Sequence, residues 1–164
     1  MTSSLLGKNK VFAEMADNAA VSALRGWKAE SVKDAKFEFD ELTFTITAGE
    51  IRGACRAVQA AGYNFLSDVT CVDWFPAEPR FHVTYHILSH GMKQRIRLRA
   101  EASTMDATMD SITEVWPSAD FYEREIFDLF GVRFNGHPNM RRIMMPDDWE
   151  GHPLRRDYPV EGYR

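Results

Sequence analysis

The sequence contains few of the residues that bind redox cofactors. Its two cysteines, Cys55 and Cys71, lie sixteen residues apart and form no CxxC pair. An iron–sulfur cluster is normally held by four cysteine ligands, so the chain does not supply a cluster site of its own. No G-x-G-x-x-G segment occurs, which argues against a dinucleotide site. We therefore expect no metal, flavin or nicotinamide on this chain, and two reduced thiols in its core.

Long apolar runs and an excess of positive charge are also missing. Hydrophobic residues make up 45% of the 164 residues, but they do not gather into the run of about 18 that a membrane helix needs. The first residues lack the charged and apolar regions of a secretory signal. The formal net charge of −4 gives no reason to expect nucleic acid as a partner. These absences predict a chain that neither inserts into a membrane directly nor binds nucleic acid.

What is present is enough amphipathic sequence for one domain with a core of its own. Apolar spacing predicts a first helix over 10–27, followed by two short strands that are joined at residues 40–41. A second helix over 47–62 begins with a capping box, and a mostly buried strand over 65–75 follows it. After a hairpin, a further helix is predicted over 105–115.

The hairpin, around His90 and Gly91, is the best-determined part of this body. If these two residues form the turn, Tyr85 faces Ile96 and one face of the hairpin is apolar. The other face then carries His82, His86, Arg95, Arg97 and Arg99. The two histidines would lie about 13 Å apart on a strand, too far for one metal ion. We interpret the arginine row as a solvated sheet face or an interface with another subunit.

Together these elements predict an α+β fold, with a single antiparallel or mixed sheet covered by helices and followed by a long extended C-terminal arm. We divide the chain into an α/β body over residues 1–118 and a unit over residues 119–164. This second unit is predicted to contain one helix and an extended, partner-binding arm.

The last predicted helix ends before Gly131, which has the position of a helix C-cap. Asp120 occupies the N-cap position, and Glu123 follows three residues later as in a capping box. Arg124 and Asp128 are spaced as an i,i+4 ion pair on the exposed side of the helix.

From Gly131 onward the sequence shows no periodic element, yet it does not have the composition of a disordered tail. It is rich in large apolar side chains: Val132, Phe134, Met140, Ile143, Met144, Met145, Trp149, Leu154, Tyr158 and Tyr163. Every cation in it is arginine, because no lysine follows Lys93. Arginine suits partly buried, bidentate contacts. The segment therefore forms either a partner surface or a wrap around its own domain.

Three motifs in this region resemble the C-type subunit of the respiratory NADH:quinone oxidoreductase, complex I, which is a peripheral-arm subunit. They are Glu123-Arg-Glu-x-Phe-Asp-Leu-Phe-Gly131, Gly136-His-Pro-Asn-Met-Arg-Arg-Ile143 and Pro146-Asp-Asp-Trp-Glu-Gly-His-Pro-Leu-Arg-Arg-Asp-Tyr-Pro159. Their order and spacing agree with the family. Over residues 1–118 only the order of elements agrees.

The resemblance implies a structural subunit of the hydrophilic arm, packed against the quinone-site and iron–sulfur subunits. In that complex, electrons pass from NADH through FMN and iron–sulfur clusters to quinone, and this transfer is coupled to ion translocation. The partner subunits bind these cofactors. The resemblance also implies a peripheral location on the cytoplasmic side of the inner membrane, or on the matrix side in mitochondria. Similar subunits occur in related membrane-bound hydrogenases and other quinone-linked dehydrogenases, so the electron donor stays open.

We therefore expect a partner interface on this chain rather than an active site. Its candidate residues are Glu123, Arg124, Glu125, Asp128, His137, Arg141, Arg142, Trp149, Arg155, Arg156 and Asp157. Consecutive arginines in an extended segment point to opposite sides, so one of each pair is expected to reach a neighbour. The rival hypothesis is a small free-standing enzyme that uses Glu123, Asp128 and His137 on a polar substrate. The sequence shows no recognisable catalytic constellation that would support it.

Overall fold

A twisted five-stranded sheet forms the centre of the protein. The computed structural model describes residues 2–162, with side chains from residue 7 onward. The strand order is β1 (Val32–Glu38), β2 (Glu41–Ile46), β5 (Gln94–Ala102), β4 (Phe81–Ser89) and β3 (Phe65–Asp73). β2 and β5 run parallel, and the other neighbours run antiparallel. The predicted α+β fold with a mixed sheet is confirmed.

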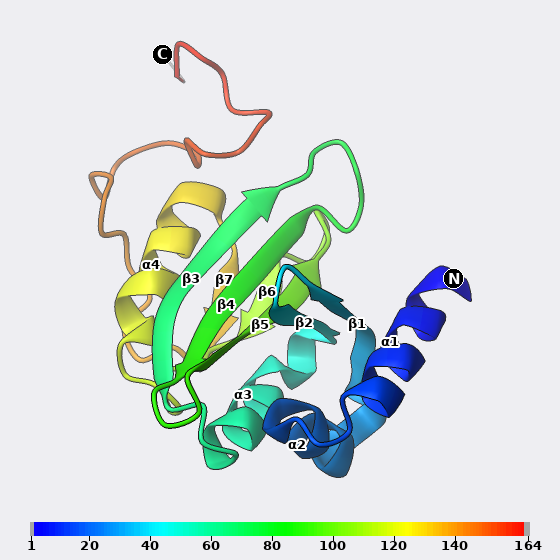
Figure 1. Ribbon diagram of the computed structural model, residues 1–164. Coiled ribbons are helices and arrows are strands. Elements are labelled where there is room, and N and C mark those ends of the chain that lie inside the picture. The colour runs from blue at the N-terminus through cyan, green and yellow to red at the C-terminus, as the bar shows by residue number, and fades with distance from the viewer. Residues whose placement is uncertain (1, 163–164) are drawn as a thin grey trace.

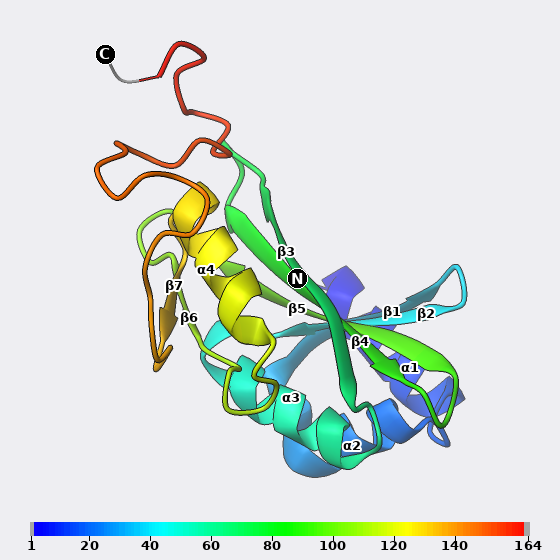
Figure 2. The ribbon, with the colours of Figure 1, turned by 90° about the vertical axis from the view of Figure 1, so that its left-hand side faces the viewer.

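Helices cover one face of this sheet and flank both of its edges (Figures 1 and 2). α2 (Ala19–Lys28) and α3 (Ile51–Ala60) lie below the sheet in both views. α1 (Thr2–Glu14) runs beside β1, and α4 (Ala119–Phe130) packs against β3 at the opposite edge.

A second, two-stranded sheet connects the segments before and after α4, so the prediction of a single sheet is wrong. β6 (Thr108–Asp110) pairs in parallel with β7 (Arg133–Asn135), and the pair places Met109 opposite Phe134. Both side chains are buried. This pairing returns the chain to the body immediately after α4 ends.

The core lies between the sheet and the covering helices. α3 contributes four fully buried residues at helical spacing: Ile51, Ala54, Cys55 and Val58. The same core includes residues from both sides of position 118, since Ala119, Ile126, Val132 and Phe134 are also buried in it. The division at residue 118 remains a prediction, but the two parts share one core.

The β4–β5 hairpin has the predicted faces but a different register. Ser89 pairs with Gln94, so the turn holds four residues instead of two. Tyr85 therefore lies opposite Leu98 rather than Ile96, a shift of two residues. Because side chains alternate along a strand with a period of two, this shift leaves every side chain on its predicted face.

The single helix predicted over residues 10–27 is wrong, because the chain forms two helices there. α1 ends at Glu14, and α2 begins after Asn18. The Asn18 side chain accepts hydrogen bonds from the backbone N–H groups of Ala20 (2.9 Å) and Val21 (3.4 Å). A local N-cap interrupts the helical spacing that the sequence pattern follows.

Three further local predictions are wrong. Residues 105–115 contain β6 and turns instead of a helix, and Met105 is 94% exposed. Thr47 makes no capping hydrogen bond, and a 3₁₀ turn, η2 (Ala48–Glu50), precedes α3. β3 is buried on one face only, because helices cover only one face of the sheet.

After β7, residues 136–162 form turns that fold back along α4, where the sequence predicts an extended arm (Figure 2). The backbone N–H of Leu154 donates to the carbonyl of Leu129 at 3.0 Å. Farther on, the N–H of Arg156 donates to the Asp73 carboxylate at 2.9 Å, at the end of β3. This C-terminal segment is thus attached to the body at several points along its length.

Candidate partner-binding surface

Glu123 lies inside the protein instead of capping a helix. α4 begins after Ser118, whose side chain makes no capping hydrogen bond, so the predicted capping box is wrong. Glu123 is 0% exposed and accepts hydrogen bonds from the Ser111 hydroxyl and the Ile112 N–H, each at 2.7 Å. Burial raises the pKa of Glu123 to about 7, although these hydrogen bonds oppose the shift. The carboxylate joins α4 to the turn that precedes it.

His137 joins the start of the C-terminal segment to the same place. Its side chain is fully buried, with Nε2 3.3 Å from the carbonyl oxygen of Asp120 and 4.0 Å from the Glu123 carboxylate. The backbone N–H of Asn139 donates to Nδ1 at 3.0 Å. Because Nδ1 accepts this hydrogen bond, the ring N–H that faces Asp120 is at Nε2 and donates to its carbonyl oxygen.

Asp128 is the centre of the C-terminal fold. It is 0% exposed, and its Oδ2 accepts the backbone N–H groups of Ile143, Met144 and Met145 at 2.8–3.0 Å. Three successive N–H groups that converge on one oxygen form an anion-binding nest. Burial opposes the ionisation of Asp128, but these donors outweigh it and lower the pKa of Asp128. A side chain of α4 thus fixes the turn at residues 142–145.

Arg142 closes the loop that follows this turn. Its guanidinium donates to the Asp128 carboxylate at 2.6 Å and to the carbonyl oxygens of Trp149 (2.9 Å) and Gly151 (3.1 Å). Nδ1 of His152 lies 2.8 Å from the Asp128 carbonyl oxygen. Both ends of the loop are therefore fastened to the same residue of α4.

Arg124 also points inward, so the predicted Arg124–Asp128 pair on the exposed side of the helix is wrong. Arg124 is 8% exposed and donates to the carbonyl oxygens of Arg141 and Arg142, both at 3.2 Å. Its nearest carboxylate is that of Asp120, at 3.9 Å. Helical spacing places Arg124 and Asp128 near each other. It does not reveal that the C-terminal segment covers this face of α4.

The two arginine pairs each divide between the inside and the outside of the fold. Arg142 and Arg155 point inward. Arg155 donates to the carbonyl of Phe130 at 2.6 Å, and its guanidinium lies 5.3 Å from the centre of the Phe81 ring. Arg141 and Arg156 have exposed side chains. One member of each pair thus points inward and holds the chain itself, although the segment forms turns instead of the extended strand on which the alternation was predicted.

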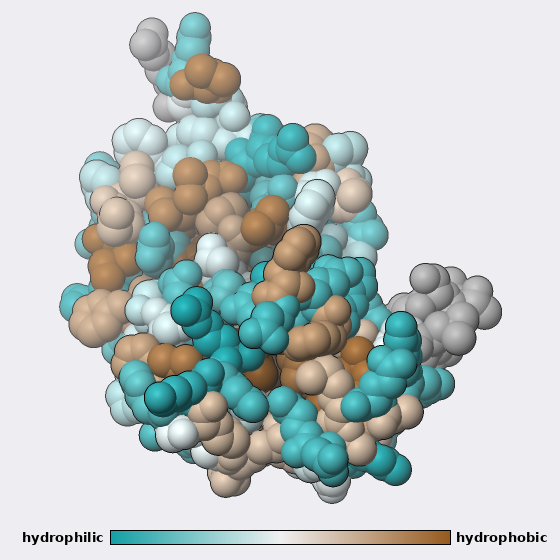
Figure 3. Space-filling model, in the orientation of Figure 1, coloured by the Kyte–Doolittle hydropathy of each residue, from teal (hydrophilic) through white to brown (hydrophobic). Residues whose placement is uncertain are grey.

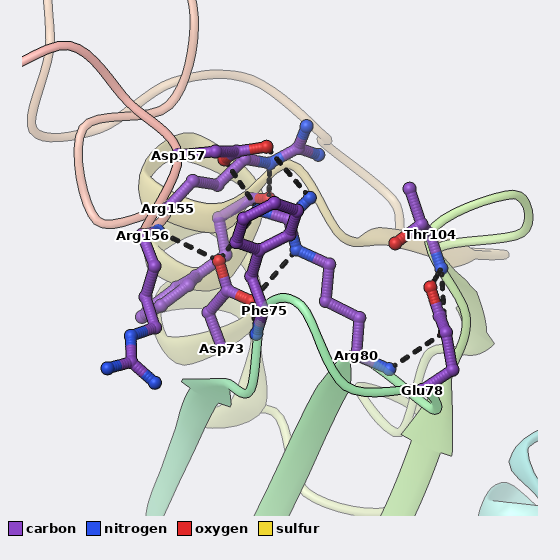
Figure 4. Close-up of polar contacts among 9 residues, drawn as sticks. Asp73, Phe75, Glu78, Arg80, Thr104, Arg155, Arg156 and Asp157 are labelled. Carbon is purple, nitrogen blue, oxygen red and sulfur yellow. Dashed lines mark hydrogen bonds and ion pairs between the residues drawn. The ribbon is translucent and has the colours of Figure 1, made fainter.

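A buried arginine that the sequence pattern did not reveal holds the end of the C-terminal segment (Figure 4). Arg80 is 2% exposed and makes two hydrogen bonds to Asp73 (both 2.8 Å) and two to Asp157 (3.0 and 2.6 Å). Its guanidinium lies 4.9 Å from the ring centres of Phe75 and Phe81. Burial opposes the ionisation of Asp73, but Arg80 and two backbone donors lower its pKa to about 2.

No short sequence pattern identifies this arrangement. Asp73 lies seven residues from Arg80, and Asp157 lies 77 residues from it. The contact between Arg80 and Asp157 forms only when the chain has folded. Asp157, predicted as a partner-interface residue, is therefore first of all an anchor, although its side chain is still 42% exposed.

The outward side of this region is apolar and charged. Five of the predicted interface residues are exposed: Glu125, Arg141, Trp149, Arg156 and Asp157. Large apolar side chains that are 36–64% exposed accompany them: Phe75, Phe121, Ile143, Met144 and Leu154. Figure 3 shows hydrophobic side chains over the upper half of the molecule, where the C-terminal segment crosses the end of β3. Large exposed apolar areas are typical of interaction sites.

The polar cluster beneath this surface does not face a substrate. Glu123 and the His137 side chain are fully buried, and four donors of the chain itself surround the Asp128 carboxylate. The free-standing enzyme hypothesis therefore finds no support in the geometry. Within residues 2–162, no group of three or more histidine, cysteine, aspartate or glutamate side chains could hold a metal ion. No helix in that part of the chain is long and apolar enough to cross a membrane.

Comparison with known proteins places this chain in a family. Residues 44–164 match the family described as the 30 Kd subunit of respiratory-chain NADH dehydrogenase. The chain belongs to this family. A relative, the C subunit of the NADH-quinone oxidoreductase of Citrifermentans bemidjiense, is 44% identical over 147 residues, which cover 89% of this chain and 91% of the relative. The likeness to the family thus extends well beyond the motifs of the last third.

Two solved structures share the fold of this family member. A trypsin-resistant fragment of the protein Nqo5 is 27% identical with a TM-score of 0.66, and the match covers 74% of this chain and 99% of the fragment. A chain of a membrane-bound sulfane sulfur reductase, an archaeal respiratory membrane complex, is 25% identical with a TM-score of 0.74. That match covers 90% of this chain and 85% of the other. Both structures carry the family fold, and both come from larger proteins or complexes.

Proposed function

We propose that this chain is a non-catalytic structural subunit of the hydrophilic arm of an NADH-quinone oxidoreductase. The observation that carries the proposal is the family match over residues 44–164, which includes the whole polar framework around α4. The parent complex transfers electrons from NADH to quinone. The role of this chain is to hold other subunits of the arm together.

In this proposal, the outward surface of α4 and the C-terminal segment is the part of the chain that contacts those subunits. Its inward residues, Asp128, Arg142 and Arg155, fix the backbone by hydrogen bonds. Its outward residues leave apolar area and charge exposed. A surface that is ordered by its own chain loses little conformational entropy when it binds, and such preorganisation favours tight association. The partners are the quinone-site and iron–sulfur subunits.

FMN, the iron–sulfur clusters and quinone are bound by those partner subunits. The properties of the two thiols support this assignment. Burial raises the pKa of Cys71 to about 12 and that of Cys55 well above its ordinary value. Thiolates ligate iron, so two buried and protonated thiols on different elements are unsuited to a cluster.

The complex holds this chain on the cytoplasmic side of the inner membrane, or on the matrix side in mitochondria. Attachment goes through the partner subunits, because the helices within residues 2–162 are too short or too polar to cross a bilayer.

A second candidate function is the equivalent role in a related membrane-bound complex with a different electron donor or acceptor. The likeness to a chain of the sulfane sulfur reductase, with a TM-score of 0.74, favours this alternative. The relative with 44% identity favours the NADH-quinone enzyme. The subunits that purify with the chain distinguish the two.

Disruption of the gene tests the proposal. Membranes from the disrupted strain should lose electron transfer from NADH to quinone, and the full-length chain should restore it. The purified chain alone should show neither NADH oxidation nor quinone reduction. Unchanged NADH:quinone activity in the disrupted strain, or activity of the isolated chain, would refute the proposal.

A further inference from the structure

We propose that the loop over residues 143–150 is a rigid knob that inserts into an apolar depression of a neighbouring protein subunit, and that its acidic side chains select a depression bordered by lysine or arginine. The inference rests on the proposed function, because it requires a neighbouring subunit. It adds the position of the contact and the chemistry of the partner.

The backbone of this knob is fixed by its own chain. The nest on Asp128 holds its first three residues, and Arg142 holds the carbonyl of Trp149. The Trp149 N–H donates to the carbonyl of Pro146 at 3.0 Å. The loop therefore keeps its shape without a partner, as a contact that is formed in advance requires.

The knob leaves apolar side chains partly exposed, unlike a loop that only wraps its own domain. Met144 is 64% exposed, Trp149 39% and Ile143 36%. A wrapping loop turns its apolar side chains inward and its polar groups outward. Here the buried polar contacts hold the backbone and the apolar side chains stay partly exposed, which favours burial against another protein.

The charge around the knob is negative. Asp147, Asp148 and Glu150 are exposed, and within residues 2–162 none of them forms an ion pair. Beside Trp149 lies an open depression of about 340 Å³, and Glu161 and the aromatic ring of Tyr158 also line it. A lysine or arginine side chain fits such a site, because carboxylates pair with its charge and aromatic faces attract it.

These features exclude the other classes of occupant. Nucleic acid is repelled by the carboxylates, and no group of acidic side chains within residues 2–162 is arranged to hold a metal ion. A free cation leaves the exposed Met144 and Ile143 uncovered. A protein surface that combines apolar area with basic side chains satisfies both parts of the knob.

The test compares two charge-reversed variants of the full-length, tagged chain in its native complex. Asp148→Lys with Glu150→Lys changes the knob. Glu14→Lys with Glu38→Lys makes the same change of charge on α1 and β1, far from the knob, where both glutamates are exposed. Each variant replaces the chromosomal gene, and the fraction of tagged chain that elutes with the assembled complex is measured at physiological salt.

We expect the knob variant to reduce the assembled fraction at least tenfold and the control to stay within twofold of the wild type. Trp149→Ala should also reduce assembly. The melting temperatures of the two isolated charge-reversed chains should agree with that of the wild type, because their changed side chains are exposed. Assembly of the knob variant at the level of the control overturns the inference and leaves the proposed function standing. A wild-type chain that elutes with no NADH-quinone oxidoreductase subunit overturns both.

Discussion

At the scale of single residues, the C-terminal segment depends on a few buried charges. Asp128 and Arg142 fix one loop, and Arg80 holds the chain farther on through Asp73 and Asp157. Removing one partner of a buried, hydrogen-bonded pair leaves the other charge unmatched, which is strongly destabilising. Inward and outward residues of the same segment should therefore respond differently to substitution.

The neighbouring Arg141 and Arg142 offer a matched test of this difference. Arg142→Lys keeps the charge but loses the fork that reaches Asp128, Trp149 and Gly151 together. We expect a loss of about 2 kcal/mol in the free energy of unfolding, or about 4–8 °C in melting temperature. Arg141→Lys, at an exposed position, should change stability by less than about 0.5 kcal/mol.

Melting curves of the two isolated variants check this prediction. Equal melting temperatures would show that Arg142 does not stabilise the free chain. The arginine would then act at the partner surface, as the sequence alone predicts for these pairs.

The raised pKa of Glu123 predicts that the protein loses stability as the pH rises toward 8. Burial raises its pKa from 4.5 to about 7 in the folded protein, so the folded state binds this proton more tightly than the unfolded state. The contribution to stability is fully present below pH 4.5 and is lost as the pH rises through 7. The loss amounts to about 3 kcal/mol at pH 8. Glu123→Gln stays neutral and should lose this part of the dependence.

Denaturant unfolding of wild type and Glu123→Gln at pH 5, 6, 7 and 8 measures this difference. The charged and titratable neighbours of Glu123 are the same in both proteins, so their contributions to the pH dependence of stability largely cancel. These neighbours are Arg52, Asp120 and His137. Parallel stability curves over this range would contradict the assignment of the shift to Glu123.

At the scale of elements, periodicity predicts faces well and boundaries poorly. The β4–β5 hairpin keeps its predicted apolar face even though its register differs by two residues. The break at Asn18 and the strand at Met109 were missed because local caps and strand pairing override helical spacing. Glu123 and Asp128 were recognised as important, but their burial depends on chain that returns from more than ten residues away. Sequence spacing carries no information on such contacts.

The shared core changes what we expect of truncated chains. A chain that ends after Pro117 lacks Ile126, Val132 and Phe134, which are buried in the core. It should lose its cooperative thermal transition, whereas a chain that ends after Asn139 should keep one at a lower temperature. Circular dichroism during heating distinguishes the two. A cooperative transition in the shorter chain would support an independent body up to residue 118.

At the scale of the whole molecule, one end combines buried charges with exposed apolar side chains. α4 and the segment after it are held by buried charges, while Met144, Trp149 and Leu154 remain exposed there. This combination fits a subunit that is folded before assembly and buries its apolar surface afterwards. Its family relatives carry the name of a subunit, and in our proposal this end of the chain contacts the other subunits.

The most direct measurement is affinity purification of the full-length, tagged chain from the membranes of its own organism, followed by identification of the co-purifying chains. The account predicts the quinone-site and iron–sulfur subunits of an NADH-quinone oxidoreductase in equal amounts with this chain, together with NADH:quinone activity. Recovery of the chain alone, or with the subunits of a complex that does not oxidise NADH, would contradict it.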